Sequence, residues 1–206
     1  MKYQIFKDYI VIDELFPEHV LTSFINEGIK NYNDSVVSTK GRGGEDLKGF
    51  TVNRSLFLDS VFRGRRDQSI ILSGLLEYIW KNKEFYDVLS KGPTVLKILE
   101  YTRFDNTVML FYPNGGFYAT HKDFMYDAEI NTIDILLKKS PDSFTGGELT
   151  IEDEVVEHVN GRVVIFPAFI EHCVKKVVTK DDSVENMRMS IQTKGSFHNM
   201  LLHAHG

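Results

Sequence analysis

Short segments rich in β-branched and aromatic residues dominate the sequence from Thr94 onward, and turn-forming Pro, Asn, Asp and Gly residues separate them. The expected strands are residues 94–104, 107–112, 117–121, 131–138, 147–151, 162–166, 172–178 and 187–193. About eight short strands at such regular spacing are typical of a jelly roll, in which two sheets face each other. The second half of the chain is therefore predicted to form a double-stranded β-helix.

The first part of the chain has helical periodicity instead. After Pro17, apolar residues recur three or four positions apart, which predicts a helix at about residues 17–31. A second apolar stripe predicts a helix at about residues 68–90, and a Gly-Pro pair ends it. Residues 33–49 have no periodicity and hold four glycines. We expect this segment to be a mobile surface loop that could act as a lid.

These patterns predict one α+β domain over residues 1–206. Residues 1–93 are expected to supply mainly helical support and the lid loop, residues 94–194 the jelly-roll core, and residues 195–206 a C-terminal tail. A chain of this length buries enough surface to fold without a disulfide or a structural metal. A bound metal would therefore be functional.

The charge of the chain argues against a nucleic-acid partner. Twenty-four Lys and Arg residues against 29 Asp and Glu residues leave a net charge of −5, which does not attract a phosphate backbone. Residues 1–16 contain acidic side chains before any apolar run long enough for a signal peptide or a membrane span. The single cysteine, Cys173, cannot form an internal disulfide. We therefore expect a cytoplasmic protein with no nucleic-acid or membrane partner.

Two histidines and one aspartate could meet at one point. His121 and Asp123 are two residues apart, so on a strand their side chains project to the same face. His172 opens a distant apolar segment, and a jelly roll can bring two such segments side by side. Two histidines and one carboxylate form the ligand set of non-haem Fe(II) oxygenases. An H-x-D triplet is weak evidence alone, because three structural side chains that bond to one another would leave the same pattern.

Arg188 and Ser190 share a face of the last expected strand by the same alternation. A rigid guanidinium with a hydroxyl beside it suits a carboxylate, which it binds in bidentate fashion. The alternative is a surface arginine that pairs with Asp181, Asp182 or Glu185.

Four motifs follow one another along the chain: FYPNGGFYATHKDF (111–124), TGGEL (145–149), GRVVIFPAFIEH (161–172) and RMS (188–190). Their order and spacing resemble the Fe(II)/2-oxoglutarate-dependent dioxygenases, most closely the prolyl 4-hydroxylase-like branch. The resemblance covers about residues 94–194. It implies that His121, Asp123 and His172 bind Fe(II).

The resemblance also implies roles around the cosubstrate. Arg188 would pair with the distal carboxylate of 2-oxoglutarate, with Ser190 as a second contact. Tyr112 matches a family tyrosine near the cosubstrate, although a packed strand aromatic explains it equally well. Many collagen-type prolyl hydroxylases have a lysine for this carboxylate. The arginine resembles hypoxia-sensing-type and bacterial relatives instead.

The activity that the resemblance implies is hydroxylation with Fe(II), 2-oxoglutarate and O2, releasing succinate and CO2, with ascorbate as a stimulant. Asp123 favours hydroxylation over halogenation, because related halogenases lack a carboxylate at that position. The expected substrate is a prolyl or other residue of a peptide or protein. The alternatives are a small-molecule hydroxylase of the same superfamily, a non-catalytic metal-binding jelly roll, and a partner-binding β sandwich without a metal.

Overall fold

Strands with both faces buried form the centre of the molecule. The computed structural model describes residues 1–38, 49–63, 65–123 and 129–196. Nearly every residue of β8 (Glu129–Leu137), β12 (Val163–Pro167) and β15 (Arg188–Ser196) is buried. The strand β12 is apolar throughout, whereas β8 and β15 also carry polar residues. They belong to an eight-stranded antiparallel sheet in the order β1-β2-β12-β8-β15-β6-β5-β3. The other members are β1 (Lys2–Ile5), β2 (Ile10–Asp13), β6 (Arg103–Tyr112), β5 (Arg54–Phe57) and β3 (Val36–Val37).

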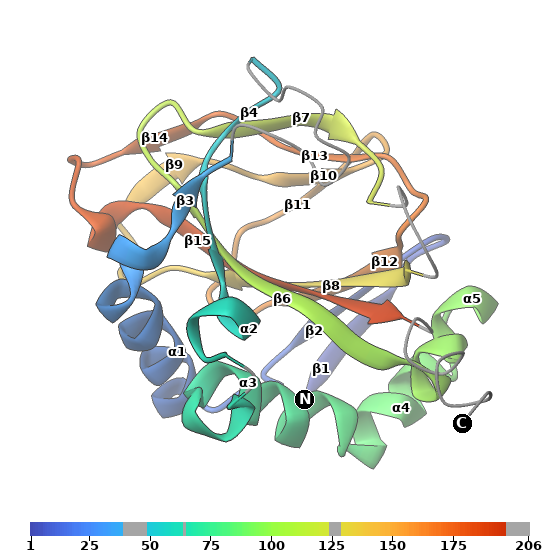
Figure 1. Ribbon diagram of the computed structural model, residues 1–206. Helices are drawn as coiled ribbons and strands as arrows, with labels where there is room; N and C mark the ends of the chain where they lie inside the picture. The colour runs from blue at the N-terminus through green and yellow to red at the C-terminus, as the bar shows by residue number, and fades with distance from the viewer. Residues whose placement is uncertain (39–48, 64, 124–128, 197–206) are drawn as a thin grey trace.

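A smaller sheet faces this large sheet (Figure 1). Its order is β11-β10-β13-β7-β4, and a separate pair joins β14 to β9. The bounds are β11 (Glu154–Val156), β10 (Leu149–Ile151), β13 (His172–Val174), β7 (Phe117–His121), β4 (Thr51–Val52), β14 (Val177–Thr179) and β9 (Phe144–Gly146). The two facing sheets form the jelly roll, and the prediction of an α+β jelly-roll fold is confirmed.

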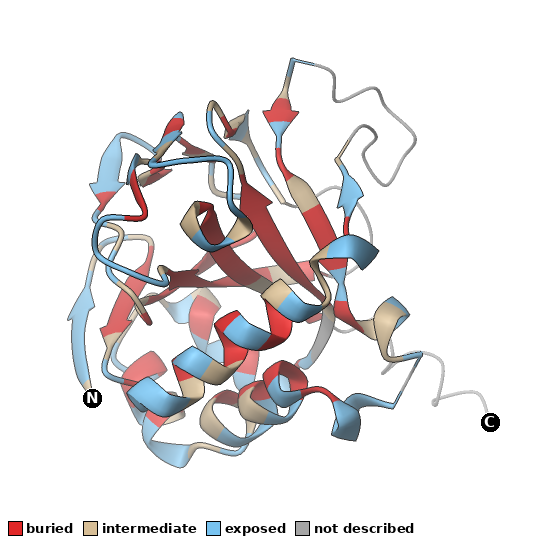
Figure 2. Ribbon diagram, turned by 90° about the vertical axis from the view of Figure 1, so that its left-hand side faces the viewer, coloured by how far each residue is buried: buried red, intermediate tan, exposed pale blue. Residues whose placement is uncertain are grey.

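Helices cover the side of the large sheet that faces away from the smaller one (Figure 1). They are α1 (Glu18–Lys30), α2 (Leu58–Val61), α3 (Ile70–Leu75), α4 (Lys83–Leu89) and α5 (Thr94–Lys97). Short helical turns are η1 (Tyr32–Asp34), η2 (Arg66–Gln68), η3 (Leu76–Trp80), η4 (Ile98–Tyr101) and η5 (Val184–Asn186). Their buried faces turn toward the sheet (Figure 2). Among the described residues, the helices are too short or too polar to span a membrane.

Strand alternation divides the core into two layers. Ile133 and Ile135 of β8 pack with the helices in one apolar cluster, whereas Leu136 packs with residues of the smaller sheet in another. The helix side of the large sheet is mostly apolar. The side that faces the smaller sheet also carries buried polar residues, namely Thr132, Asp134, Arg188, Ser190 and Lys194. The functional chemistry is therefore expected between the two sheets.

The predicted strands 117–121, 131–138, 147–151, 162–166 and 187–193 correspond to β7, β8, β10, β12 and β15. The predicted strand 172–178 divides into β13 and β14, which join different sheets. The first 93 residues contribute helices and also five short strands that the sequence patterns did not indicate. Most of the predicted lid, over residues 39–48, lies outside the described residues, as does residue 197 onward of the predicted tail.

The predicted strand 94–104 is wrong. Residues 94–101 form α5 and η4, and the strand β6 begins only at Arg103 and runs without a break to Tyr112. Leu96 and Leu99 are the buried residues of this segment. Their spacing of three is helical, and it outweighs the β-branched character of the neighbouring residues.

The predicted helix 68–90 is interrupted. It consists of α3, the π-helical turn η3 and α4, with a break at Lys81 and Asn82. The Asn82 side chain accepts a hydrogen bond from the Phe85 amide, so it caps a new helix. Because the apolar stripe continues on both sides, periodicity alone does not reveal the break.

A buried carboxylate joins α1 to the start of α3. Glu27 on α1 accepts hydrogen bonds from the Ser69 hydroxyl (2.6 Å) and from the Ile70 amide (2.5 Å). The Ser69 side chain in turn caps α3 by accepting from the Leu72 amide. Glu27 thus fixes the helical layer that supports the large sheet.

Replacement of Glu27 by alanine is expected to destabilise the protein by about 1–3 kcal/mol, because it leaves the buried Ser69 hydroxyl and the partly buried Ile70 amide without their charged acceptor. Urea denaturation measures the loss. Glu18→Ala, at an exposed position of the same helix, serves as the control. Equal stability of the two variants would contradict the structural role of Glu27.

Candidate metal centre

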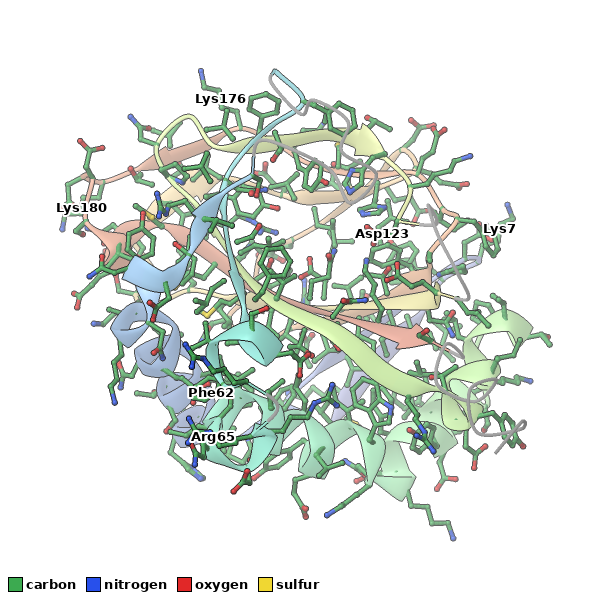
Figure 3. All side chains as sticks on the ribbon, viewed as in Figure 1. Lys7, Phe62, Arg65, Asp123, Lys176 and Lys180 are labelled. Carbon is green, nitrogen blue, oxygen red and sulfur yellow. The ribbon has the colours of Figure 1, made fainter. Side chains whose placement is uncertain are left out.

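The pairing of β7 with β13 brings the two predicted histidines together. His121 and His172 are direct partners in this antiparallel pair, and their ring centroids are 4.2 Å apart. Asp123 follows β7 by two residues, and its side chain lies between the two sheets (Figure 3). The sequence alternation that predicted a shared face for His121 and Asp123 agrees with this placement.

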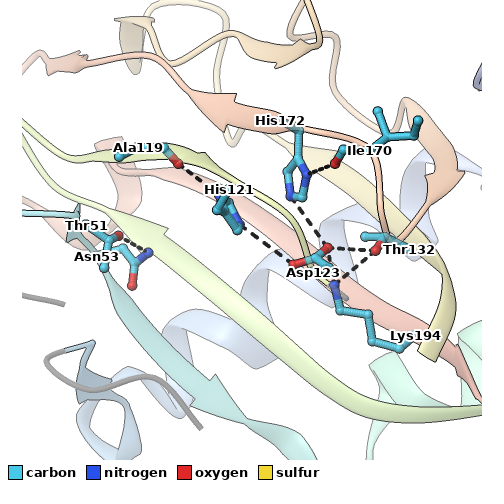
Figure 4. Close-up of polar contacts among 9 residues, drawn as sticks. All are labelled: Thr51, Asn53, Ala119, His121, Asp123, Thr132, Ile170, His172 and Lys194. Atoms are coloured by element: carbon cyan, nitrogen blue, oxygen red, sulfur yellow. Dashed lines mark hydrogen bonds and ion pairs between the residues drawn. The ribbon is translucent and has the colours of Figure 1, made fainter. Parts of the chain in front are cut away.

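Backbone carbonyls orient both imidazoles. The Nδ1 atom of His121 lies 2.8 Å from the Ala119 carbonyl oxygen, and that of His172 lies 3.0 Å from the Ile170 carbonyl oxygen (Figure 4). A carbonyl oxygen only accepts, so each Nδ1 carries the proton and donates it. Each Nε2 atom is therefore left with its lone pair, which is the form that binds a metal.

The donor atoms of the three side chains converge. His121, Asp123 and His172 each offer one ligand atom, and these atoms lie within 4.8 Å of one another. The Nε2 atoms of His121 and His172 lie 3.7 and 3.5 Å from the Asp123 carboxylate oxygens. The buried His172 Nε2 atom has no hydrogen-bond partner among the described residues. This donor set fits a divalent metal that keeps further positions open.

Aromatic side chains surround the imidazoles. Tyr118 stacks on His121 with ring centroids 3.8 Å apart, and Phe50 contacts both of these rings. Phe166 lies against His172 at 4.7 Å. The apolar rings limit water at the site and hold the imidazoles in place.

The protonation states favour metal binding. Burial, together with the neighbouring His172, lowers the pKa of His121 to about 4, so its imidazole is neutral near pH 7. Burial alone would raise the pKa of Asp123, but the Lys194 ammonium and the two imidazoles hold it below the ordinary range. Near neutral pH the centre thus presents one carboxylate and at least one neutral imidazole.

Arg188 is buried at the start of β15. Its Nε donates to the Gly147 carbonyl oxygen (2.8 Å) and one Nη donates to the Ser190 hydroxyl (3.3 Å). The other Nη has no partner among the described residues, although it is buried. Gly147 has a φ of 70°, and a Cβ there would lie 2.9 Å from Arg188 Cδ, so a side chain would displace the arginine. The alternative of a surface arginine is wrong because Arg188 is fully buried.

Tyr112 lies opposite Arg188 in the β6–β15 pair, with the guanidinium carbon 4.8 Å from its ring centroid. Burial raises the pKa of Tyr112, against the opposing effects of Arg188 and of a hydrogen bond with Asn53. Tyr112 is a packed strand aromatic that neighbours Arg188, and its place beside the cosubstrate stays a prediction.

Three further polar residues of this face were not singled out from the sequence. Lys194 contacts Asp123 and Thr132, and the Thr132 hydroxyl donates to Asp123 (2.6 Å) (Figure 4). Asp134 lies two residues beyond Thr132 on β8. Alternation along β15 also places Lys194 on the face of Arg188 and Ser190, but a lysine in a strand is usually exposed, so alternation alone did not single it out.

Asp134 interacts with both Arg188 and the histidine centre. Burial raises its pKa, while the charges of Arg188, His172 and Lys194 and a hydrogen bond with Ser190 oppose that rise. A single carboxyl group therefore lies within electrostatic reach of the arginine and of the histidine centre. Both belong to one polar space between the sheets.

The sequence over residues 107–193 matches the family model described as 2OG-Fe(II) oxygenase superfamily. This range includes all six residues predicted for the site. Over this range, 87 of the 206 residues, the chain is similar to that superfamily. The match supports a 2-oxoglutarate-dependent dioxygenase, a class that uses Fe(II), 2-oxoglutarate and O2. The match agrees with the superfamily that the sequence motifs indicated.

Solved structures of prolyl hydroxylases share the fold of this chain. One, from Trichoplax adhaerens in complex with a hypoxia inducible factor peptide fragment, has a TM-score of 0.68 and 16% identity, covering 96% of this chain and 87% of that chain. A Pseudomonas putida prolyl-4-hydroxylase has a TM-score of 0.62 and 14% identity, covering 92% of each chain.

A viral collagen prolyl hydroxylase from Paramecium Bursaria Chlorella virus-1, in a 2OG complex, has a TM-score of 0.58 and 15% identity. It covers 91% of this chain and 95% of that chain. No curated protein sequence matches this chain significantly. At these identities the similarity establishes the jelly-roll fold.

The neutral state of His121 predicts a pH dependence of stability. In the metal-free protein the pKa of His121 is about 4, below the ordinary value of 6.5, so the unfolded state binds the extra proton between these values. The free energy of unfolding should therefore fall as the pH drops from 6.5 toward 4, by at most about 1.4 kcal/mol per pH unit from this group.

Urea denaturation in the presence of a chelator measures this slope. His121→Asn should flatten it, whereas His19→Asn, at an exposed position on α1, should leave it unchanged. An identical slope in wild type and His121→Asn would show that His121 is not held neutral by the fold.

Proposed function

We propose that this protein is an Fe(II)- and 2-oxoglutarate-dependent hydroxylase of the prolyl 4-hydroxylase-like type, with His121, Asp123 and His172 as its iron ligands. The observation that carries the proposal is the convergence of three ligand atoms within 4.8 Å, with each imidazole Nε2 left free by a carbonyl on Nδ1. When bound, Fe(II) supplies the redox chemistry that couples O2 to oxidative decarboxylation of 2-oxoglutarate.

Arg188 is proposed to bind the distal carboxylate of 2-oxoglutarate. Its free Nη is a buried donor without a partner among the described residues, so an incoming carboxylate would satisfy it. Gly147 and Ser190 hold the guanidinium in one orientation. The Ser190 hydroxyl is a second contact for the same carboxylate, and the Tyr112 ring forms a wall beside it.

The reaction then balances as substrate C–H, O2 and 2-oxoglutarate giving substrate C–OH, succinate and CO2. The proposed substrate is a prolyl or other residue in a peptide. The support is the shared fold with three prolyl hydroxylases, one of them in complex with a peptide. The alternative is a small-molecule substrate.

A screen for stimulated succinate release tests the substrate class. Purified protein is supplied with Fe(II), 2-oxoglutarate and ascorbate, and with either proline-containing peptides or a panel of metabolites. We expect peptides to stimulate succinate release and to gain about 16 Da, the mass of one oxygen atom. About one oxygen atom should be added to peptide for each succinate formed. Stimulation by metabolites alone would support the small-molecule alternative.

His172→Ala and Asp123→Ala are expected to abolish substrate-dependent succinate formation, because each removes one of three proposed iron ligands. Circular dichroism checks that each variant is folded, and His19→Asn is the control. Turnover close to wild type in either variant would remove that residue from the ligand set.

Arg188→Ala is expected to raise the 2-oxoglutarate concentration needed for half-maximal succinate formation by about 10- to 150-fold, the equivalent of 1.5–3 kcal/mol for a charge-assisted contact. Arg188→Lys keeps the charge without the bidentate geometry, and its effect should be intermediate. An unchanged 2-oxoglutarate titration in Arg188→Ala would reject this role.

A further inference from the structure

A buried lysine lies against the carboxylate of the candidate metal centre. Lys194 on β15 is the direct cross-strand partner of Thr132 on β8, and its side chain is only 7% exposed. Its ammonium forms an ion pair with Asp123 Oδ2 and donates to the Thr132 hydroxyl (3.0 Å) (Figure 4). Lys194 belongs to neither the proposed iron ligands nor the proposed 2-oxoglutarate contacts.

The two oxygens of Asp123 have different surroundings. Oδ2 accepts from the Thr132 hydroxyl at 2.6 Å and also contacts the Lys194 ammonium. Oδ1 lies 3.7 Å from His121 Nε2. Thr132 thus holds the orientation of the carboxylate through a neutral hydrogen bond, and Lys194 supplies a full positive charge to it.

This positive charge has opposite consequences in the two states of the centre. Without a metal, the Asp123 carboxylate is buried beside two imidazoles, and Lys194 is its counter-charge. With a divalent metal on the same carboxylate, the ammonium becomes a like charge close to the metal. The ammonium and the metal therefore compete for Asp123.

We propose that Lys194 is an internal counter-cation of Asp123, which weakens metal binding until the dianionic cosubstrate joins the metal, and which thereby couples the binding of the two. The proposal rests on the proposed function, because it takes Asp123 as a metal ligand. A bound metal, Lys194 and Arg188 together bring more positive charge than the Asp123 carboxylate and the nearby Asp134 carboxyl group can balance. The two carboxylates of 2-oxoglutarate offset this excess.

Binding of Mn(II), followed by electron paramagnetic resonance of the free ion with and without 2-oxoglutarate, tests the proposal without requiring turnover. Lys194→Met removes the charge and keeps the length of the side chain, while Thr132 still orients Asp123. We expect this variant to bind Mn(II) at least about tenfold more tightly than wild type in the absence of 2-oxoglutarate. The factor by which 2-oxoglutarate strengthens Mn(II) binding should be smaller than in wild type.

Two further variants separate charge from orientation. Thr132→Val removes the orienting hydrogen bond and keeps the ammonium, so Mn(II) binding should weaken by about 10- to 100-fold. Lys194→Arg keeps the charge, and its affinity for Mn(II) should remain within about threefold of wild type. The distinguishing result is that Lys194→Met strengthens Mn(II) binding whereas Thr132→Val weakens it.

Weaker Mn(II) binding in Lys194→Met, or an unchanged effect of 2-oxoglutarate, would overturn the proposal while leaving the proposed function intact. Failure of the wild type to bind Mn(II) would contradict both. If Lys194→Met does not fold without a metal, refolding on addition of Mn(II) supports the proposal and continued unfolding contradicts it. If Lys194→Met is unfolded without a metal, the Mn(II) titration is also carried out on Lys194→Gln, which removes the charge but keeps a polar side chain.

Discussion

The antiparallel pairing of β7 with β13 is the constraint on which the site depends. It places His121 directly opposite His172, although the two lie far apart in the chain. A shift of the register by one residue would turn His172 to the other side of its strand and bring Cys173 into its place. The hydrogen-bonding pattern between two short strands therefore decides whether a metal centre can form at all.

The large sheet provides the other half of the site because its two sides differ. Its helix side packs in a continuous apolar cluster, which holds the sheet in position. Its inner side carries Arg188, Asp134 and Lys194, all of them buried. Isolated buried charges are costly, but here each has an opposite charge or a polar group of the same space within electrostatic reach. Apolar packing on the helix side thus holds the large sheet in place while its inner side carries charged residues.

Much of this arrangement could be predicted from the sequence, because two-residue alternation places side chains on a face before the fold is known. That rule found His121 with Asp123, and Arg188 with Ser190. It also applied to Lys194 and Asp134, but a lysine in a strand is usually solvent-exposed, and only the sheet order shows that this face of β15 is covered. The burial of Lys194 as a counter-charge of Asp123 therefore could not be predicted from the sequence of the strand alone.

Local secondary-structure propensity gave wrong predictions at other positions, and the structure shows the reasons. Residues 94–101 are rich in strand-forming side chains, yet Leu96 and Leu99 are buried at helical spacing. The strands β3 and β4 are two residues long, and their pairing with β5 and β7 defines them rather than their own composition. Tertiary contacts, which a single segment does not encode, decide such elements.

The central claim is that two imidazoles and one carboxylate hold Fe(II) with positions left for 2-oxoglutarate. An anaerobic titration of the protein with Fe(II) and 2-oxoglutarate, followed by visible absorption, tests it most directly. The account predicts a charge-transfer band that appears only when both are present, saturates at one equivalent of iron and is absent in a variant lacking His172. No band in the wild-type protein, or an unchanged band without His172, would contradict it.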